Sequence, residues 1–256
     1  MILSLNGIIA GKGSTPILPT NLIMNLDAGN SASYSGSGTA WNDLSGNGNN
    51  ATLINGTSFS SVNGGTMVYD GVDDVANANI INFGTQSLSF SFWVYPTQTT
   101  NVDSIFGQGL YPANTTGGYV YIVMRNDTAT RRIQFRVASN GTDSKTLFCD
   151  NAYTLNAWNF ITLTYNATTR DMNCYVNSVL KTSTTSVTGI FGNTSISQNL
   201  TPNNTSGKFL SIGMYDESRT LLPYTGNIAQ AIIYNKEQNS TEITTNFNNT
   251  KTRFGL

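Results

Sequence analysis

The stretch SFSFWVY at residues 89–95 decides the expected fold. Phe90, Phe92 and Val94 occupy alternate positions, so an extended chain places their side chains on one face. Pro96 follows at once, and proline is tolerated at the end of a strand but not in its middle. We therefore predict a strand that ends near residue 96 and buries the face of Phe90.

The same alternation recurs along most of the chain, between turns rich in Gly, Asn, Asp, Ser and Thr. Residues 133–137 alternate and are followed by the turn Asn140-Gly141. Residues 159–165 and 172–176 flank a short turn, as the two strands of a hairpin do. We expect strands from residue 22 to residue 235, which predicts an all-β protein built as an antiparallel sandwich or barrel.

One helix is expected near the C-terminal end, over residues 240–254. Asn239 and Glu242 have the spacing of a capping box. Ile243, Phe247 and Phe254 then recur at helical spacing before Gly255. The pattern predicts a helix whose apolar stripe docks on the sandwich.

Composition excludes several classes of function. Charged residues make up 11% of the 256 residues and the formal net charge is -1, so no basic surface is available for nucleic acid. The sequence contains no run of 18 apolar residues, which is about the length that a membrane-spanning helix needs. Histidine is absent and only three glutamates occur, which removes the usual general base and the clustered carboxylates of a β-sandwich glycosidase. We therefore predict no catalytic residues, no nucleic-acid partner and no membrane span.

Neutral groups supply most of the polarity. The 33 asparagines and 35 threonines are explained either by binding of a neutral ligand such as a sugar or by a simple compositional bias. Cys149 and Cys174 are the only thiols. A single disulfide between them is conceivable, although free, buried thiols are favoured because disulfide-dependent secreted domains usually hold more cysteines.

Six phrases, in their order and spacing, resemble one family, the laminin G-like domains of the concanavalin A-like lectin/glucanase fold. They are LDAGNSASYSGSGTAWNDLSGNGNNATL (26–53), MVYDGVDDVA (67–76), LSFSFWVYP (88–96), AWNFITLTYN (157–166), LSIGMY (210–215) and YTGNIAQAIIYNKEQNSTEI (224–243). The resemblance implies an antiparallel two-sheet jelly-roll sandwich with a short C-terminal helix, occupying residues 21–256.

Three carboxylates fall within five residues, at Asp70, Asp73 and Asp74. Such a loop is either a solvated turn or a calcium site, because calcium prefers oxygen ligands. Domains of the resembling family often hold a structural calcium near this region, completed by an acidic residue after a Gly-x-Ile phrase. Here that phrase is followed by Ala229 and Gln230, which removes one expected ligand, and no other cofactor is predicted.

Tyr111, Tyr119 and Tyr121 belong to the Gly-rich stretch GLYPANTTGGYVYIVMR at residues 109–125. We expect a surface loop there, in which a flat ring beside Asn and Thr could stack on a sugar, although packing within the loop explains the rings equally well. A local basic cluster on an alternating strand is expected to be a solvated face, and its residues are Arg125, Arg131, Arg132 and Arg136.

The opening MILSLNGIIAGKGS lacks the charged start and unbroken apolar run of a secretory signal. Residues 1–20 are instead predicted to form an N-terminal docking arm outside the jelly roll. Its apolar side chains are Ile2, Leu3, Leu5, Ile8 and Ile9. They could dock on a neighbouring subunit by strand addition or groove insertion, or add a strand to their own sandwich.

The opening stretch and the closing EITTNFNNTKTRFGL (242–256) are similar to the ends of laminin G-like domains in tailed-phage virion proteins. The resemblance implies a capsid decoration, head fibre or tail component, made in the host cytoplasm and exposed on the particle. It would be present in multiple copies or as a homo-oligomer, bound to other virion proteins through the arm, with weak adhesion to cell-surface or mucus glycans.

Two other functions compete with this hypothesis. A free-standing carbohydrate-binding module or lectin is the alternative, since jelly rolls host many functions. A glycoside hydrolase would need two carboxylates that flank the scissile bond, and the neighbours Asp73 and Asp74 point apart.

Overall fold

The computed structural model describes residues 17–99, 102–109, 118–126, 130–139, 144–183, 200, 209–215 and 222–256. The predicted arm residues Ile2, Leu3, Leu5, Ile8 and Ile9 lie outside this part of the chain, as do Tyr111 and the Asn140-Gly141 turn. Over the described ranges, no helix combines the length and the apolar character that a bilayer crossing requires.

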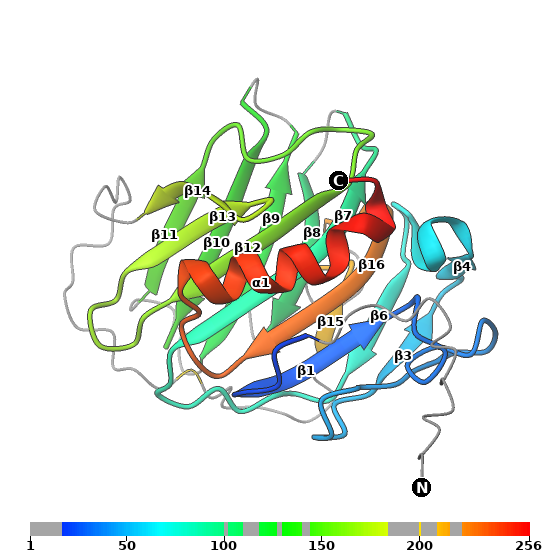
Figure 1. The fold of residues 1–256 in the computed structure, drawn as a ribbon, viewed down its shortest axis with the longest axis horizontal. Helices are drawn as coiled ribbons and strands as arrows, with labels where there is room; N and C mark the ends of the chain where they lie inside the picture. The colour runs from blue at the N-terminus through cyan, green and yellow to red at the C-terminus, as the bar shows by residue number, and fades with distance from the viewer. Residues whose placement is uncertain are drawn as a thin grey trace, which may run out of the picture.

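Two eight-stranded sheets face each other (Figure 1). Sheet A has the order β14 (Val179–Ser183), β13 (Met172–Val176), β12 (Asn159–Tyr165), β7 (Leu88–Pro96), β16 (Thr225–Tyr234), β5 (Thr66–Asp70) and β4 (Ser58–Ser60), with β1 (Leu22–Asp27) also paired to β16. Sheet B has the order β11 (Ser144–Cys149), β10 (Arg132–Ala138), β9 (Tyr119–Arg125), β8 (Val102–Gln108), β15 (Leu210–Ile212), β6 (Val75–Ala78), β3 (Ala51–Ile54) and β2 (Ala40–Trp41).

Every pairing between these strands is antiparallel, so the predicted all-β, two-sheet jelly-roll sandwich is confirmed. The predicted hairpin of residues 159–165 and 172–176 has the same bounds as β12 and β13. Phe90, Phe92 and Val94 lie together in the core between the sheets, as the alternation in residues 89–95 requires. Trp93 takes the opposite side of β7 and joins a second apolar cluster.

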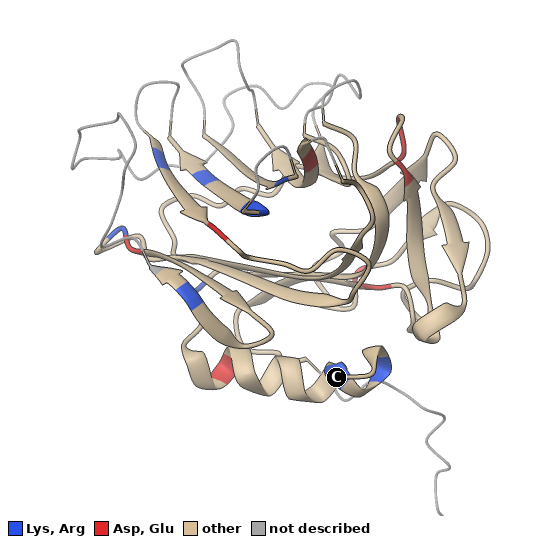
Figure 2. Ribbon diagram, turned by 90° about the horizontal axis from the view of Figure 1, so that it is seen from above, with Lys and Arg blue, Asp and Glu red and all other residues tan. Residues whose placement is uncertain are grey.

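This second cluster lies under the C-terminal helix α1 (Ser240–Thr250), which covers the outer face of sheet A only (Figure 2). The predicted capping box is present, since the Asn239 side chain accepts from the Glu242 backbone and the Glu242 side chain accepts from the Asn239 backbone. The predicted helix of residues 240–254 divides into α1 and the 3-10 turn η2 (Lys251–Phe254). Ile243 and Phe254 are buried, and Phe247 packs against the same cluster.

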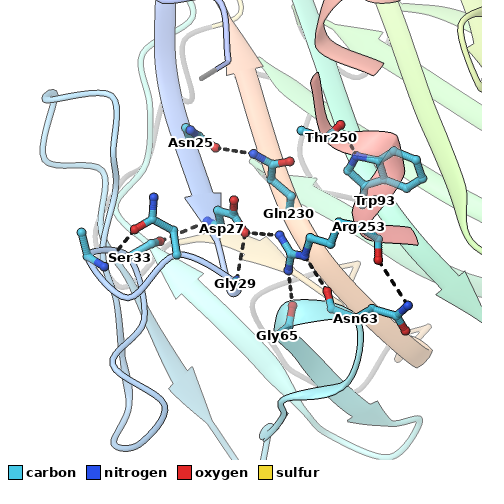
Figure 3. A network of polar contacts seen from close by, with 12 residues as sticks. Asn25, Asp27, Gly29, Ser33, Asn63, Gly65, Trp93, Gln230, Thr250 and Arg253 are labelled. Carbon is cyan, nitrogen blue, oxygen red and sulfur yellow. Dashed lines mark hydrogen bonds and ion pairs between the residues drawn. The ribbon is translucent and has the colours of Figure 1, made fainter. Parts of the chain in front are cut away.

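The end of η2 is tied to both β1 and the turn after β4 (Figure 3). Arg253 Nη1 lies 2.5 Å from Asp27 Oδ1, and Arg253 Nε donates to the Asn63 carbonyl at 2.7 Å. Its Nη2 donates to the Gly65 carbonyl. These carbonyls belong to a further 3-10 turn, η1 (Val62–Gly64), and to Gly65, which follows it. Arg253 therefore fastens the last turn of the chain to segments that lie about 190 or more residues earlier.

Residues 17–20 also contact the domain. Ile17 is buried in the second cluster, the Leu18 backbone N–H donates to Asn246 Oδ1 at 3.1 Å, and Tyr234 donates to the Leu18 carbonyl at 3.0 Å. The described end of the predicted arm thus lies along α1 and β16. The docking of residues 1–16 stays a prediction.

Candidate functional site

The outer face of sheet B carries the tyrosines that the sequence singled out. Along β9 the inward side chains Val120, Ile122 and Met124 join the core, so Tyr119 and Tyr121 point outward. On β10, Arg136 is paired with Tyr121 in the strand register and shares its face. We define the tyrosine face as Tyr119, Tyr121, Gln134, Arg136, Phe148 and Tyr215.

Ring contacts and hydrogen bonds order this face. The ring centres of Tyr119 and Tyr121 are 6.3 Å apart, and the two rings are nearly parallel, with an interplanar angle of 1°. Tyr215 meets Tyr121 at 5.0 Å and 59°. Gln134 Nε2 donates to the Tyr121 hydroxyl at 2.6 Å, which fixes the amide beside the ring.

Arg136 is held in the same way. Its Nη2 donates to Ser144 Oγ at 2.7 Å, and its guanidinium lies 5.6 Å from the centre of the Tyr119 ring. Arg136 is buried, so the expectation of a solvated face is wrong for this arginine, whereas Arg131 is exposed and Arg125 and Arg132 are half-buried. The alternation of β10 correctly predicts that Arg136 points to the outer side of the sheet. Its contact with Tyr119 could not be predicted, because Tyr119 lies on a different strand.

Tyr119 and Tyr121 themselves do not lie on a surface loop, and the predicted Gly-rich loop at residues 110–117 lies outside the described part of the chain. Both residues lie within β9, and their exposed fractions are 3% and 5%. The alternation YVYIVMR is a strand pattern that could have predicted this position. Gln134, Phe148 and Tyr215 remain half-buried and border the two tyrosines.

Tyr215 was not predicted as part of the site, because 94 residues separate it from Tyr121. It follows β15 and crosses over β8 at Gly107. A Cβ atom at Gly107 would lie 2.1 Å from the Tyr215 carbonyl oxygen, so only glycine permits this crossing. The composition of either segment alone does not reveal the contact.

The acidic loop lies at a different place, between β5 and β6. One carboxylate oxygen from each of Asp70, Asp73 and Asp74 lies within 4.8 Å of the others, so the expectation that Asp73 and Asp74 point apart is wrong. Asp74 is buried, and burial raises the pKa of its carboxyl group. Its Oδ2 accepts from the Asp70 backbone at 2.8 Å, while Oδ1 has no partner in the described part of the chain.

These oxygens suit calcium, and Asp70, Asp73 and Asp74 are the residues that would hold it. The position after the Gly-x-Ile phrase, where the resembling family has a further calcium ligand, is not paired with this loop. Thr225, not Gln230, is paired with Asp70 across β5 and β16. Gln230 is paired with Asp27 on β1 and donates to Asn25 Oδ1 at 3.0 Å. Gln230 therefore belongs to the polar network around Arg253 (Figure 3).

Comparison with solved structures shows the same fold in otherwise distant proteins. The receptor-binding domain of botulinum neurotoxin type G superposes with a TM-score of 0.61 at 18% identity, covering 90% of this chain and 51% of that one. The binding domain of paraclostridial mosquitocidal protein 1 gives a TM-score of 0.63 at 16% identity, covering 90% of this chain and 52% of that one. The chain thus spans about half the length of these toxin domains.

A third structure matches over nearly its whole length. Domain 4 of AbnA, an extracellular arabinanase from Geobacillus stearothermophilus in complex with arabinotriose, has a TM-score of 0.60 at 14% identity. The match covers 88% of this chain and 98% of that domain. No curated protein sequence matches the chain. The family model of the concanavalin A-like lectin/glucanases matches residues 70–244, and the chain belongs to this superfamily.

Proposed function

We propose that the chain is a non-enzymatic, lectin-like carbohydrate-binding module that contacts a glycan with the tyrosine face. The observation that carries this proposal is the grouping of three tyrosine rings with an ordered amide and guanidinium on one sheet face. Sugar rings pack their C–H faces on aromatic rings, and their hydroxyl groups pair with amide and guanidinium groups. Binding sites commonly combine aromatic walls with a few fixed polar groups in this way.

The half-buried side chains supply the contact in this proposal. Gln134, Phe148 and Tyr215 form the accessible border, while the buried Tyr121 holds the Gln134 amide in place. The arabinanase domain, solved with arabinotriose, and the toxin domains, described as receptor-binding, support a recognition role on this fold. The absence of histidine and the scarcity of glutamate support a role without catalysis.

A glycan array probed with the full-length chain tests the proposal, followed by titration of the best glycan. Gln134→Ala and Tyr215→Ala should each weaken binding by roughly tenfold or more, because each removes a contact on the border of the face. Gln98→Ala is the matched control, since Gln98 is a half-buried glutamine on the loop after β7, and its binding should be unchanged.

Two results would contradict glycan binding at the tyrosine face. One is a silent array with a folded protein. The other is a bound glycan whose affinity falls equally in the control variant Gln98→Ala and in Gln134→Ala, which would place the contact elsewhere. Turnover of a polysaccharide by the purified protein would instead favour the hydrolase hypothesis.

A virion role is compatible with glycan binding, and we propose it as the setting in which the module works. The chain would be a phage capsid decoration, head fibre or tail component, present in multiple copies and exposed on the particle surface. Its support is the similarity of the opening and closing phrases to virion proteins. Deletion of residues 1–16 should leave folding intact and abolish incorporation into particles, whereas full incorporation of the truncated chain would contradict the docking role.

A further inference from the structure

Cys149 and Cys174 come from opposite sheets and meet in the core. Cys149 ends β11 in sheet B, and Cys174 lies in β13 in sheet A. Both belong to the cluster between the sheets, both have an exposed fraction of 0%, and both are free thiols. They therefore occupy inward positions on strands that no backbone ladder connects.

The strands that carry the two thiols lie next to each other. β11 lies against β13 and β14 across the interior of the sandwich, at the end where Figure 1 places these three strands together. The Cys174 side chain lowers the pKa of Cys149, while the Cys149 side chain and burial raise the pKa of Cys174.

We propose that Cys149 and Cys174 form a latent inter-sheet cross-link, a site at which a small disulfide oxidant closes a reversible disulfide between sheet A and sheet B. The proposal is independent of glycan binding. It rests on two inward thiols that belong to one core cluster and lie on adjacent strands of opposite sheets.

The chemistry consists of two exchange steps. The Cys149 thiolate attacks one sulfur of an oxidant RS–SR, forming the mixed disulfide Cys149–S–S–R and releasing RS⁻, which takes up the proton lost by Cys149. The Cys174 thiolate then attacks the Cys149 sulfur and releases the second RS⁻, which takes up the proton of Cys174. Two thiols are oxidised to one disulfide, and RS–SR is reduced to two molecules of RSH.

The position of β11 explains how a small oxidant can reach a buried thiol. β11 is the last strand of sheet B, paired only with β10 in the described part of the sheet. Edge strands open locally at a lower free energy than central strands. Opening of this edge exposes Cys149 while the other strands stay paired, so Cys149 is expected to react first.

The test uses the full-length chain and oxidised β-mercaptoethanol as the small disulfide. We expect both thiols to disappear together, with a loss of about 2 Da that corresponds to two hydrogen atoms. Trypsin should then release one linked pair of peptides, residues 146–170 and 171–181. The melting temperature should rise by roughly 5 to 10 °C and return to its initial value in dithiothreitol.

Cys149→Ala and Cys174→Ala are the matched controls, since each keeps one thiol and a similar core. Neither should lose 2 Da or gain thermal stability in the oxidant. Separate RS adducts on the two cysteines, a cross-link only between molecules, or a cross-linked product with a lower melting temperature would overturn the proposal. Retention of both thiols after prolonged incubation just below the melting temperature would overturn it as well.

Discussion

The outer faces of the two sheets have the same alternating strand pattern but differ in their side chains and in what covers them. On sheet A the outward side chains Trp93, Phe160 and Ile232 are apolar, and α1 covers them. On sheet B the outward side chains of β9 and β10 mix tyrosine with Gln134 and Arg136, and no helix from the described ranges packs on them. An apolar face needs a cover to leave water, whereas a mixed face can keep a polar border for a ligand.

The comparison predicts that truncation of a large side chain under α1 has the largest effect. Trp93 is fully buried and stacks on Phe254 at 4.1 Å and on Phe247 at 5.8 Å. Trp93→Ala should lower the free energy of unfolding by about 4 kcal/mol, because it leaves a cavity and removes the bond from Trp93 Nε1 to Thr250. Urea or guanidinium unfolding measures this value.

Tyr215→Ala is the matched truncation of an aromatic ring on the other face. The Tyr215 ring is half-buried, so its removal should lower the free energy of unfolding by about 1 kcal/mol or less. Equal losses in the two variants would contradict the division between a structural face and a ligand face.

The next effect concerns the ion pair that fastens η2 to β1. Asp27 and Arg253 have side chains that are 2% and 13% exposed, so loss of one partner leaves a buried charge. Arg253→Met should lower the free energy of unfolding by about 3 kcal/mol. The double variant Asp27→Asn with Arg253→Met should recover part of that loss in the same unfolding experiment, and failure to recover any would show that the carbonyl bonds of Arg253 dominate.

Local patterns predicted the sandwich because its determinants are local. The alternation around Phe90 sets which side of β7 enters the core, and the Asn239 and Glu242 spacing sets where α1 begins. Both features act over a few residues, so a single sequence contains them. The bounds of β12 and β13 were predicted for the same reason.

The site was harder to predict because its geometry is non-local. Tyr121 meets Gln134 across one strand pair and Tyr215 across a crossing that Gly107 permits. Arg253 likewise pairs with Asp27, which lies 226 positions away in the sequence. No composition or spacing rule relates such distant positions, which is why the contact of Tyr121 with Tyr215 and the role of Arg253 were not predicted.

The inner side of sheet B provides a pH-dependent contrast. Asp103 in β8 is 1% exposed, and its carboxylate oxygens have no hydrogen-bond partner of ordinary geometry within the described ranges. Burial raises the pKa of Asp103 to about 7, against the opposing effect of the Thr225 backbone N–H. The carboxyl group is therefore neutral in the folded chain at pH 5.

Stability should fall as pH rises through this range. In the unfolded chain Asp103 loses its proton near 3.8, the ordinary pKa of an aspartate, so between pH 4 and 7 the unfolded state binds fewer protons than the folded state. Between pH 5 and pH 8 the wild type should lose about 2 kcal/mol more than Asp103→Asn. Urea unfolding at both pH values measures the difference, and parallel curves for the two proteins would contradict the shifted pKa.

The smallest expected change in stability separates the two faces most sharply. Tyr121→Phe keeps the ring and its contact with Tyr215 but removes the hydroxyl that accepts from Gln134. The free energy of unfolding should fall by about 1 kcal/mol or less, because one hydrogen bond is lost and the Gln134 amide can turn toward water. Glycan affinity should fall several-fold, because the amide is no longer held beside the ring. Tyr234→Phe, which removes a buried hydroxyl under α1 that pairs with Leu18 and Asn246, should show the reverse order, with a larger loss of stability and unchanged glycan affinity.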